Sequence, residues 1–208
     1  MRELEILLAS YDEMKSKGLK CVLATLVHVE GSSYRQAGAR MLVNENGEMV
    51  GAISGGCLEG DALKKALLAL EQGQNKLVTY DTSDEDDAVI GAQLGCNGVI
   101  QVLFEPIRND QKNNPMELIR KVIKINEPSV IVTLFNLRKS EQQTGTKLII
   151  DRETGVTGIT EDMEYLNAIK KNAGLAFDQN TSLFKEYHLS GETHHAFIEL
   201  CLPSPTLV

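Results

Sequence analysis

Short apolar runs typical of β-strands alternate with amphipathic helical segments along the chain, and the order of these segments is the strongest constraint on its fold. Apolar residues at helical spacing predict four helices, near residues 4–14, 58–72, 116–126 and 163–172. Apolar or alternating runs predict roughly ten strands, near residues 21–29, 39–43, 48–54, 76–80, 99–105, 129–137, 147–151, 156–159, 183–189 and 196–202. Because the order is not a strict βαβ alternation, we expect a mixed α+β fold within the broad α/β class, with a mostly mixed sheet covered by helices.

The stretch at residues 108–115 is polar and rich in asparagine, and it is the best candidate for a linker. We therefore expect residues 1–107 to form the core that carries the candidate site. Residues 108–208 would form a companion α/β segment, packed on that core as one compact unit. A chain of 208 residues is long enough to bury a sizeable core.

Charge and composition exclude several classes of function. The net charge of −8 argues against sequence-independent binding of nucleic acid, which needs lysine and arginine to replace counterions on phosphate. No run of 18 apolar residues predicts a membrane span. The chain start is acidic from its third residue and lacks the pattern of a secretory signal. The four cysteines form no CxxC pair, so we expect reduced thiols in the cytoplasm.

The first candidate site is the segment Gly55-Gly56-Cys57, between a predicted strand and a predicted helix. Two glycines let the backbone approach a ligand closely. The unpaired amide groups at the start of a helix attract anions and would stabilise a thiolate at Cys57. A tight turn around a small buried cysteine explains this segment equally well when it is taken alone.

The second candidate site is Gly95-Cys96-Asn97-Gly98, another cysteine flanked by glycines, just before a predicted strand. On its own, a plain glycine-rich turn explains it better, but two such cysteines would both be explained by one shared site. A zinc site is not predicted, because no CxxC or HxxxH spacing supplies four ligands. The adjacent His194 and His195 would point to opposite faces of a strand and so could not easily chelate one metal.

The third candidate element follows the first predicted strand and consists of Ser32, Ser33, Tyr34 and Arg35, together with Arg40. Hydroxyl and guanidinium groups are donors suited to a phosphate or a carboxylate. An ordinary surface loop is the alternative interpretation.

Taken in chain order, these motifs resemble the XdhC/CoxI family, whose members are accessory proteins of xanthine dehydrogenase and related molybdenum hydroxylases. The segments that carry the resemblance are AT (24–25), VEGSSYR (29–35), GARM (38–41), ISGGCLEG (53–60), YDT (80–82) and GCNG (95–98). The resemblance is strong over roughly residues 10 to 106 and looser beyond, and the fixed order of several linked motifs makes it specific. Longer family members continue into a Rossmann-like domain, which we expect this chain to lack because it stops about where that domain's first strand would begin.

The resemblance implies a maturation factor rather than a metabolic enzyme. Such a protein binds the molybdenum cofactor, a molybdopterin, as cargo. It assists sulfuration of the cofactor by a cysteine desulfurase and delivers it to an apo-hydroxylase of the xanthine dehydrogenase type in the cytoplasm. Residues 1–107 would then be the cofactor-handling core, with no nucleic acid or membrane as partner and with a homodimer left open.

Cys57 and Cys96 match the cysteines of the family's motifs and would be soft thiolate contacts for molybdenum or its sulfido group. The remaining expected cofactor contacts are Gly55, Gly56, Ser32, Ser33, Tyr34, Arg35, Arg40 and Asn97. Among these, the 32–35 loop and the amide groups after Gly56 are our candidates for holding the pterin phosphate. Two alternatives stay open: a thiol-dependent sulfur or acyl transferase with Cys57 as nucleophile, and an interaction module whose glycine–cysteine loops are only structural.

Overall fold

The computed structural model describes residues 1–81, 98–153, 155–158, 163–189 and 191–203. This part of the chain contains four helices and ten strands, as the sequence predicts, and its mixed α+β class is confirmed. The strands do not share one mixed sheet: they form two five-stranded sheets in which the neighbouring strands are antiparallel. None of the helices in the described residues is long and apolar enough to cross a membrane.

The chain divides into two compact units. We call Ser10–Ile107 with Arg138–Gln143 the N-terminal unit, and Met1–Ala9, Arg108–Leu137 and Thr144–Val208 the C-terminal unit. Helix α1 (Arg2–Ser16) is therefore shared between them.

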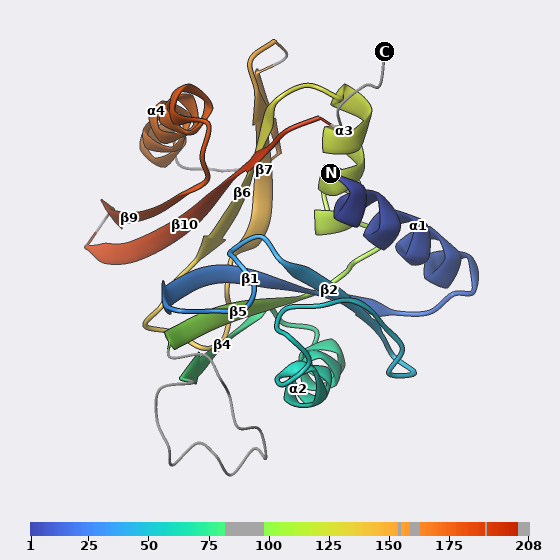
Figure 1. The fold of residues 1–208 in the computed structure, drawn as a ribbon. Coiled ribbons are helices and arrows are strands. Elements are labelled where there is room, and N and C mark those ends of the chain that lie inside the picture. The colour runs from blue at the N-terminus through green and yellow to red at the C-terminus, as the bar shows by residue number, and fades with distance from the viewer. Residues whose placement is uncertain (82–97, 154, 159–162, 190, 204–208) are drawn as a thin grey trace. The chain divides into compact units, whose positions relative to one another are not determined.

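The N-terminal unit is a sheet with one helix, α2 (Glu59–Gln72), along one face (Figure 1). The strand order is β3-β2-β1-β5-β4, where the strands are β1 (Cys21–Gly31), β2 (Arg40–Asn44), β3 (Met49–Gly51), β4 (Lys76–Asp81) and β5 (Gly98–Pro106). Ala62, Ala66 and Ala69 recur at helical spacing and are fully buried against the sheet. The helix ends where Gly73 takes a left-handed conformation (φ 60°) and donates its amide to the last turn.

The free edge of β4 is covered by a segment from the later half of the chain. The amide of Leu77 donates to the carbonyl of Ser140 (2.8 Å), and Lys76 Nζ lies 3.2 Å from Glu141 Oε1. Covering an edge strand in this way removes unpaired backbone groups that could pair with another chain. These contacts explain why Arg138–Gln143 belongs to the N-terminal unit.

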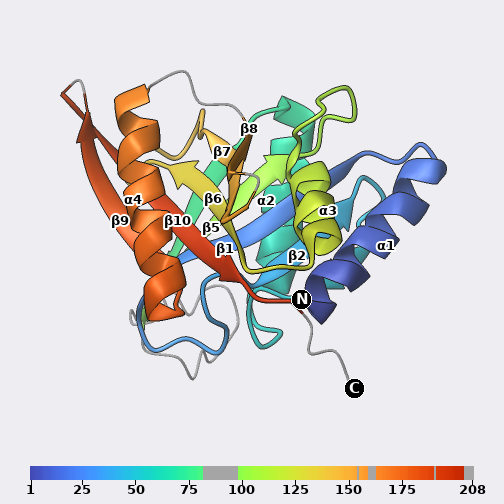
Figure 2. The ribbon, with the colours of Figure 1, turned by 90° about the horizontal axis from the view of Figure 1, so that it is seen from above.

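The C-terminal unit is a second sheet with a helix on each face (Figure 1). Its strand order is β8-β7-β6-β10-β9, where the strands are β6 (Ser129–Phe135), β7 (Gly145–Asp151), β8 (Gly155–Gly158), β9 (Leu183–Leu189) and β10 (Glu192–Cys201). Helix α4 (Met163–Gln179) lies along β9 and β10 (Figure 2), and its Ile169 and Ala173 are buried with Val130 and Val132. Alternate residues of β6 point to the other face, where α3 (Pro115–Ile125) contacts β6 and β7.

The two largest boundary differences from the sequence prediction are at the end of α4 and at the start of β10. Helix α4 does not end near residue 172 but continues through Gly174 to Gln179, because Ala173 and Ala176 remain buried in the core. That burial outweighs the cost of about 1 kcal/mol that a glycine imposes inside a helix. Strand β10 begins at Glu192 and not at residue 196, because it pairs with β9 over that whole length.

Candidate functional site

Two of the predicted motifs lie toward the same end of the N-terminal sheet. Strands β1, β3 and β4 run toward this end, and β5 starts there, since Gly31 pairs with Gly98 and Asp81 pairs with Val99. The loop after β1 carries the Ser32–Arg35 motif, and the loop after β3 carries Gly55 to Cys57. We call these two segments the serine loop (residues 32–35) and the cysteine loop (residues 54–58).

The cysteine loop is folded around the hydroxyl of Ser54. This hydroxyl donates to Glu59 Oε2 (2.5 Å) and accepts from the backbone amides of Gly56 and Leu58, both at 3.2 Å. The half-buried Cys57 thiol is its fourth neighbour, with Sγ 3.9 Å from Ser54 Oγ. Gly56 closes the turn with φ +111°, a conformation that residues with a Cβ rarely adopt.

Glu59 is a member of the site that the sequence interpretation missed. Its carboxylate lies at the start of α2, where Oε1 accepts from the amide of Ser54 (2.9 Å) and Oε2 from the Ser54 hydroxyl. Burial alone would raise the pKa of Glu59, but these hydrogen bonds and neighbouring backbone amides hold that pKa below its usual value. Glu59 is therefore ionised at neutral pH and supplies the negative charge that a helix N-terminus favours. A serine five residues before a glutamate in the first helical turn is the only sequence signal for this pair.

This arrangement changes the expectation for the loop amides. The amides of Gly56 and Leu58 already donate to the Ser54 hydroxyl, and the N-terminal end of α2 already carries the carboxylate of Glu59. They are therefore poor candidates for holding a phosphate. Cys57 lies two residues before the first residue of α2, between strand and helix as the sequence predicts.

The serine loop and the cysteine loop touch through Tyr34 and Gly55. A Cβ built on Gly55 would lie 3.1 Å from Cγ of Tyr34 and 3.2 and 3.3 Å from its two Cδ atoms. Only hydrogen atoms on Gly55 leave room for the ring at this distance. Gly55 is therefore required for the close approach, whereas Gly56 is required for its positive φ.

The chain near the second cysteine motif also reaches the serine loop. Cys96 and Asn97 lie outside the described residues, and Gly98 follows them directly. A Cβ on Gly98 would lie 2.5 Å from the carbonyl oxygen of Glu30 and 2.6 Å from that of Ser32. Strand β5 therefore starts in close backbone contact with the beginning of the serine loop.

Arg40 is not brought to this site. It lies on β2 next to Met41, and Met41 is buried in the core beneath α2, so the Arg40 side chain points to the opposite face of the sheet. It is only 3% exposed, and its Nη1 donates to the carbonyl of Gly38 at 3.0 Å. Arg35 and Ser33 are half-buried in the serine loop itself.

The histidines of β10 have structural roles. His194 and His195 point to opposite faces, as predicted: the ring of His194 lies 5.8 Å from that of Tyr165, whereas His195 stacks on Phe135 and Phe184. Nδ1 of His195 accepts from the amide of Leu137 (3.3 Å), so the ring proton lies on Nε2 and faces Glu186 (3.1 Å). Within the described residues no group of three His, Cys, Asp or Glu side chains could hold a metal ion.

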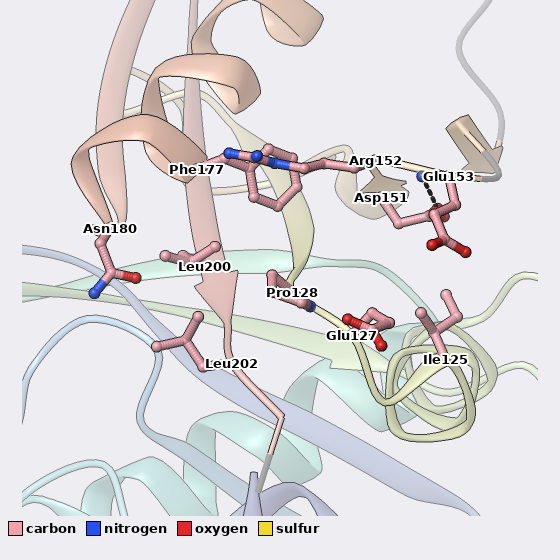
Figure 3. Close-up of a pocket in the computed structure, with 10 residues that line it drawn as sticks. All are labelled: Ile125, Glu127, Pro128, Asp151, Arg152, Glu153, Phe177, Asn180, Leu200 and Leu202. Atoms are coloured by element: carbon pink, nitrogen blue, oxygen red, sulfur yellow. Dashed lines mark hydrogen bonds between the residues drawn. The ribbon is translucent and has the colours of Figure 1, made fainter. Parts of the chain in front are cut away.

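A separate pocket of about 530 Å³ lies at one end of the C-terminal sheet (Figure 3). Its apolar wall includes Leu200 and Leu202, and Arg152 stacks over the ring of Phe177 at 5.1 Å. Arg152 is also paired with Asp178 (3.3 Å), while three further carboxylates line the pocket, those of Glu127, Asp151 and Glu153. This excess of negative charge makes the pocket a poor match for a phosphorylated ligand.

The Ser54–Glu59 pair makes a prediction about pH. Because the pKa of Glu59 is lowered in the folded state, its stabilising effect is complete above the unfolded-state pKa and is lost as the pH falls through the folded-state pKa. We expect Glu59→Gln to lower the melting temperature at pH 7, and the difference from the unmodified protein to shrink between about pH 5 and pH 3. Thermal unfolding followed by circular dichroism measures this.

Glu71→Gln is the matched control, because Glu71 is exposed near the other end of α2. A loss of stability in Glu59→Gln that stays constant from pH 7 to pH 3 would contradict an ionised Glu59 at the start of the helix.

Three comparisons with known proteins bear on this site. The sequence profile of the XdhC and CoxI family matches residues 14–81, which include the serine loop and the cysteine loop. A Bacillus subtilis protein named as a probable xanthine dehydrogenase subunit is 42% identical over 95 residues, or 46% of this chain and 29% of that protein. "Molybdenum cofactor insertion chaperone PaoD" of Escherichia coli is 35% identical over 98 residues, or 47% of this chain and 29% of that protein.

A solved structure agrees over nearly the whole chain. The crystal structure described as a xanthine dehydrogenase from Bacillus halodurans superposes with a TM-score of 0.65 and 30% sequence identity. The match covers 96% of this chain and 53% of that one, so this chain spans about half the length of the solved protein. The matches to the two curated relatives cover less than a third of their lengths. Residues 14–81, which carry the serine loop and the cysteine loop, are therefore the part of this chain that matches the XdhC and CoxI family.

Proposed function

We propose that this chain binds the molybdenum cofactor, a molybdopterin, as cargo and passes it to a hydroxylase of the xanthine dehydrogenase type. The observation that carries the proposal is the contact between Tyr34 and Gly55, which joins two family motifs beside the half-buried thiol of Cys57. The relative named as a molybdenum cofactor insertion chaperone supports the molybdenum cofactor as the cargo. The relative named as a probable subunit of xanthine dehydrogenase supports an enzyme of that type as the recipient.

Cys57 is the proposed soft ligand for molybdenum or its sulfido group. Among the described residues its thiol has one hydrogen-bonding neighbour, the hydroxyl of Ser54, and that bond does not consume the sulfur lone pairs. Thiolate sulfur is a soft donor, unlike the carboxylates and hydroxyls around it.

Cys96 is the proposed second thiolate. Gly98 packs against the backbone of Ser32, and two residues of chain span at most about 7 Å. In the same proposal Asn97, Ser32, Ser33 and Arg35 supply polar contacts to the cofactor, while Arg40 and the amides of Gly56 and Leu58 are left out.

The proposal includes sulfuration of the bound cofactor by a cysteine desulfurase in the cytoplasm. The alternative is a thiol-dependent sulfur or acyl transferase with Cys57 as nucleophile. Among the described residues the thiol contacts the Ser54 hydroxyl, which itself donates to the Glu59 carboxylate. The relative named as an insertion chaperone favours a carrier.

Titration of the purified protein with molybdopterin tests the proposal. We expect one cofactor per site for the unmodified chain, and at least tenfold weaker binding for Cys57→Ala and for Cys96→Ala, which corresponds to about 1.4 kcal/mol. Cys57→Ser is the matched variant, because it keeps a hydroxyl beside Ser54 but removes the soft donor. Unchanged affinity in both alanine variants, with unchanged melting temperatures, would disprove the thiolate site. Multiple turnovers of released product would favour the transferase.

A further inference from the structure

Tyr34 is the most exposed of the large apolar and aromatic side chains in the described residues, with 74% of its surface accessible. It is nevertheless held in place, because Gly55 lies against it.

The three distances from Gly55 show how the ring is held. The Cβ position of Gly55 is nearly equidistant from Cγ, Cδ1 and Cδ2 of Tyr34, at 3.1, 3.2 and 3.3 Å. Within the plane of the ring, the only point equidistant from these three carbons is the ring centre. That point lies about 1.4 Å from each of them, which is the radius of an aromatic ring. The Cβ position therefore lies above the ring, about 3 Å from its plane. Gly55 covers one face of Tyr34, and the high exposure means that the other face is open.

An aromatic ring with one supported face and one open face is suited to stacking a planar ligand. Offset stacking of two aromatic rings contributes beyond the apolar area that it buries. Stacked heteroaromatic bases typically lose one to two orders of magnitude in affinity when the aromatic residue is removed. In molybdopterin the pterin is reduced and fused to a pyran ring, and its aminopyrimidinone ring stays planar and conjugated, so this ring offers a flat face for stacking.

We propose that the open face of Tyr34 stacks on the pterin ring of the cofactor, with Gly55 supporting the opposite face. Gly55 is two residues from Cys57, a span of at most about 7 Å, so one ligand can reach both the ring and the thiol. Tyr34 orients the pterin end, and the thiolate of Cys57 contacts the molybdenum end. This inference rests on the proposed function and assigns Tyr34 its part in it.

The test compares Tyr34→Phe, Tyr34→Leu and Gly55→Val for binding of molybdopterin, measured by equilibrium dialysis, and of free oxidised pterin, measured by quenching of its fluorescence. The chain contains no tryptophan, so the pterin signal is read without that background. We expect Tyr34→Phe to stay within about twofold of the unmodified affinity and Tyr34→Leu to bind about tenfold more weakly. Gly55→Val keeps the tyrosine but pushes its ring away, and we expect a similar loss.

The outcomes separate this inference from the proposed function. If the unmodified protein binds molybdopterin, Cys57→Ala weakens it and Tyr34→Leu does not, the stacking role is disproved and the cargo role stands. If the unmodified protein binds no molybdopterin, the proposed function fails first. Because Tyr34 is exposed, the leucine variant should keep its melting temperature, and this measurement excludes unfolding as the cause of weak binding.

Discussion

Gly98→Ala is expected to destabilise the N-terminal unit by about 3 kcal/mol, the upper end of the range for overpacking. A Cβ at this position would lie 2.5 Å from the oxygen of Glu30 and 2.6 and 2.8 Å from the oxygen and nitrogen of Ser32. All three are backbone atoms, so no side chain can rotate away to relieve the clash. The end of β1 or the start of β5 must shift instead, at the place where the two strands are paired.

For a chain of this length, a loss of about 3 kcal/mol corresponds to a fall of about 6–12 °C in melting temperature, which thermal unfolding measures directly. Gly60→Ala is the control: it lies in the first turn of α2 with nothing within 4 Å of its added Cβ. We expect that variant to be neutral or more stable by up to about 1 kcal/mol. Equal melting temperatures for the two variants would contradict the close packing of Gly98 on the serine loop.

The same position shows what sequence can and cannot predict about this site. The glycines beside Cys96 and Cys57 mark loops in the sequence, because glycine frees the backbone from steric limits. The pattern does not say which neighbour needs the space. The missing side chain of Gly55 leaves space for the ring of Tyr34, and that of Gly98 leaves space for the backbone of Ser32. Both partners are distant in the sequence. Such contacts depend on tertiary packing, so a local pattern cannot supply them.

Element types are predictable for a physical reason, and strand partners are not. The apolar period of α2 and the glycine after it give its limits directly, since both are local features. The pairing of β1 with β5 is different, because β2, β3, α2 and β4 lie between them in the chain. Apolar alternation shows which face of a strand is buried. It does not show which other strand lies beside it, because the same alternation is compatible with any neighbouring strand. The same apolar pattern is therefore compatible with one mixed sheet and with two antiparallel sheets.

Arg40 and Glu59 illustrate the same limit for single side chains. The residue type of Arg40 predicts a donor for the cofactor, but its neighbour Met41 faces the core under α2, and strand alternation turns Arg40 away from the cysteine loop. Alternation could have excluded it once the buried face was known. A glutamate in a first helical turn is common, so the sequence does not single out Glu59, and only its hydrogen bonds to Ser54 show that it shapes the loop.

The second large effect is expected in the C-terminal unit, from Asn114→Ala. Asn114 is only 1% exposed and makes four hydrogen bonds at the start of α3. Its Oδ1 accepts from the amides of Met116 (3.0 Å) and Glu117 (3.1 Å), and its Nδ2 donates to the carbonyls of Arg108 (3.2 Å) and Gln111 (3.1 Å). Loss of the cap costs about 1 kcal/mol, and loss of the two donated bonds about 1 kcal/mol each. We therefore expect the free energy of unfolding to fall by about 3 kcal/mol, measured by denaturant unfolding.

Asn114→Asp separates the two parts of this effect. The carboxylate keeps the acceptor for both helix amides and adds a favourable charge at the helix N-terminus, but it replaces the Nδ2 donor by an oxygen facing two carbonyls. We therefore expect the aspartate variant to be clearly less stable than the unmodified chain despite its intact cap. Asn113→Ala is the control: its side chain accepts only from Lys121 Nζ in the described contacts, and its loss should cost less than about 0.5 kcal/mol. If Asn114→Asp were as stable as the unmodified protein, the cap alone would account for Asn114, and the loop from Arg108 to Gln111 would not depend on its amide.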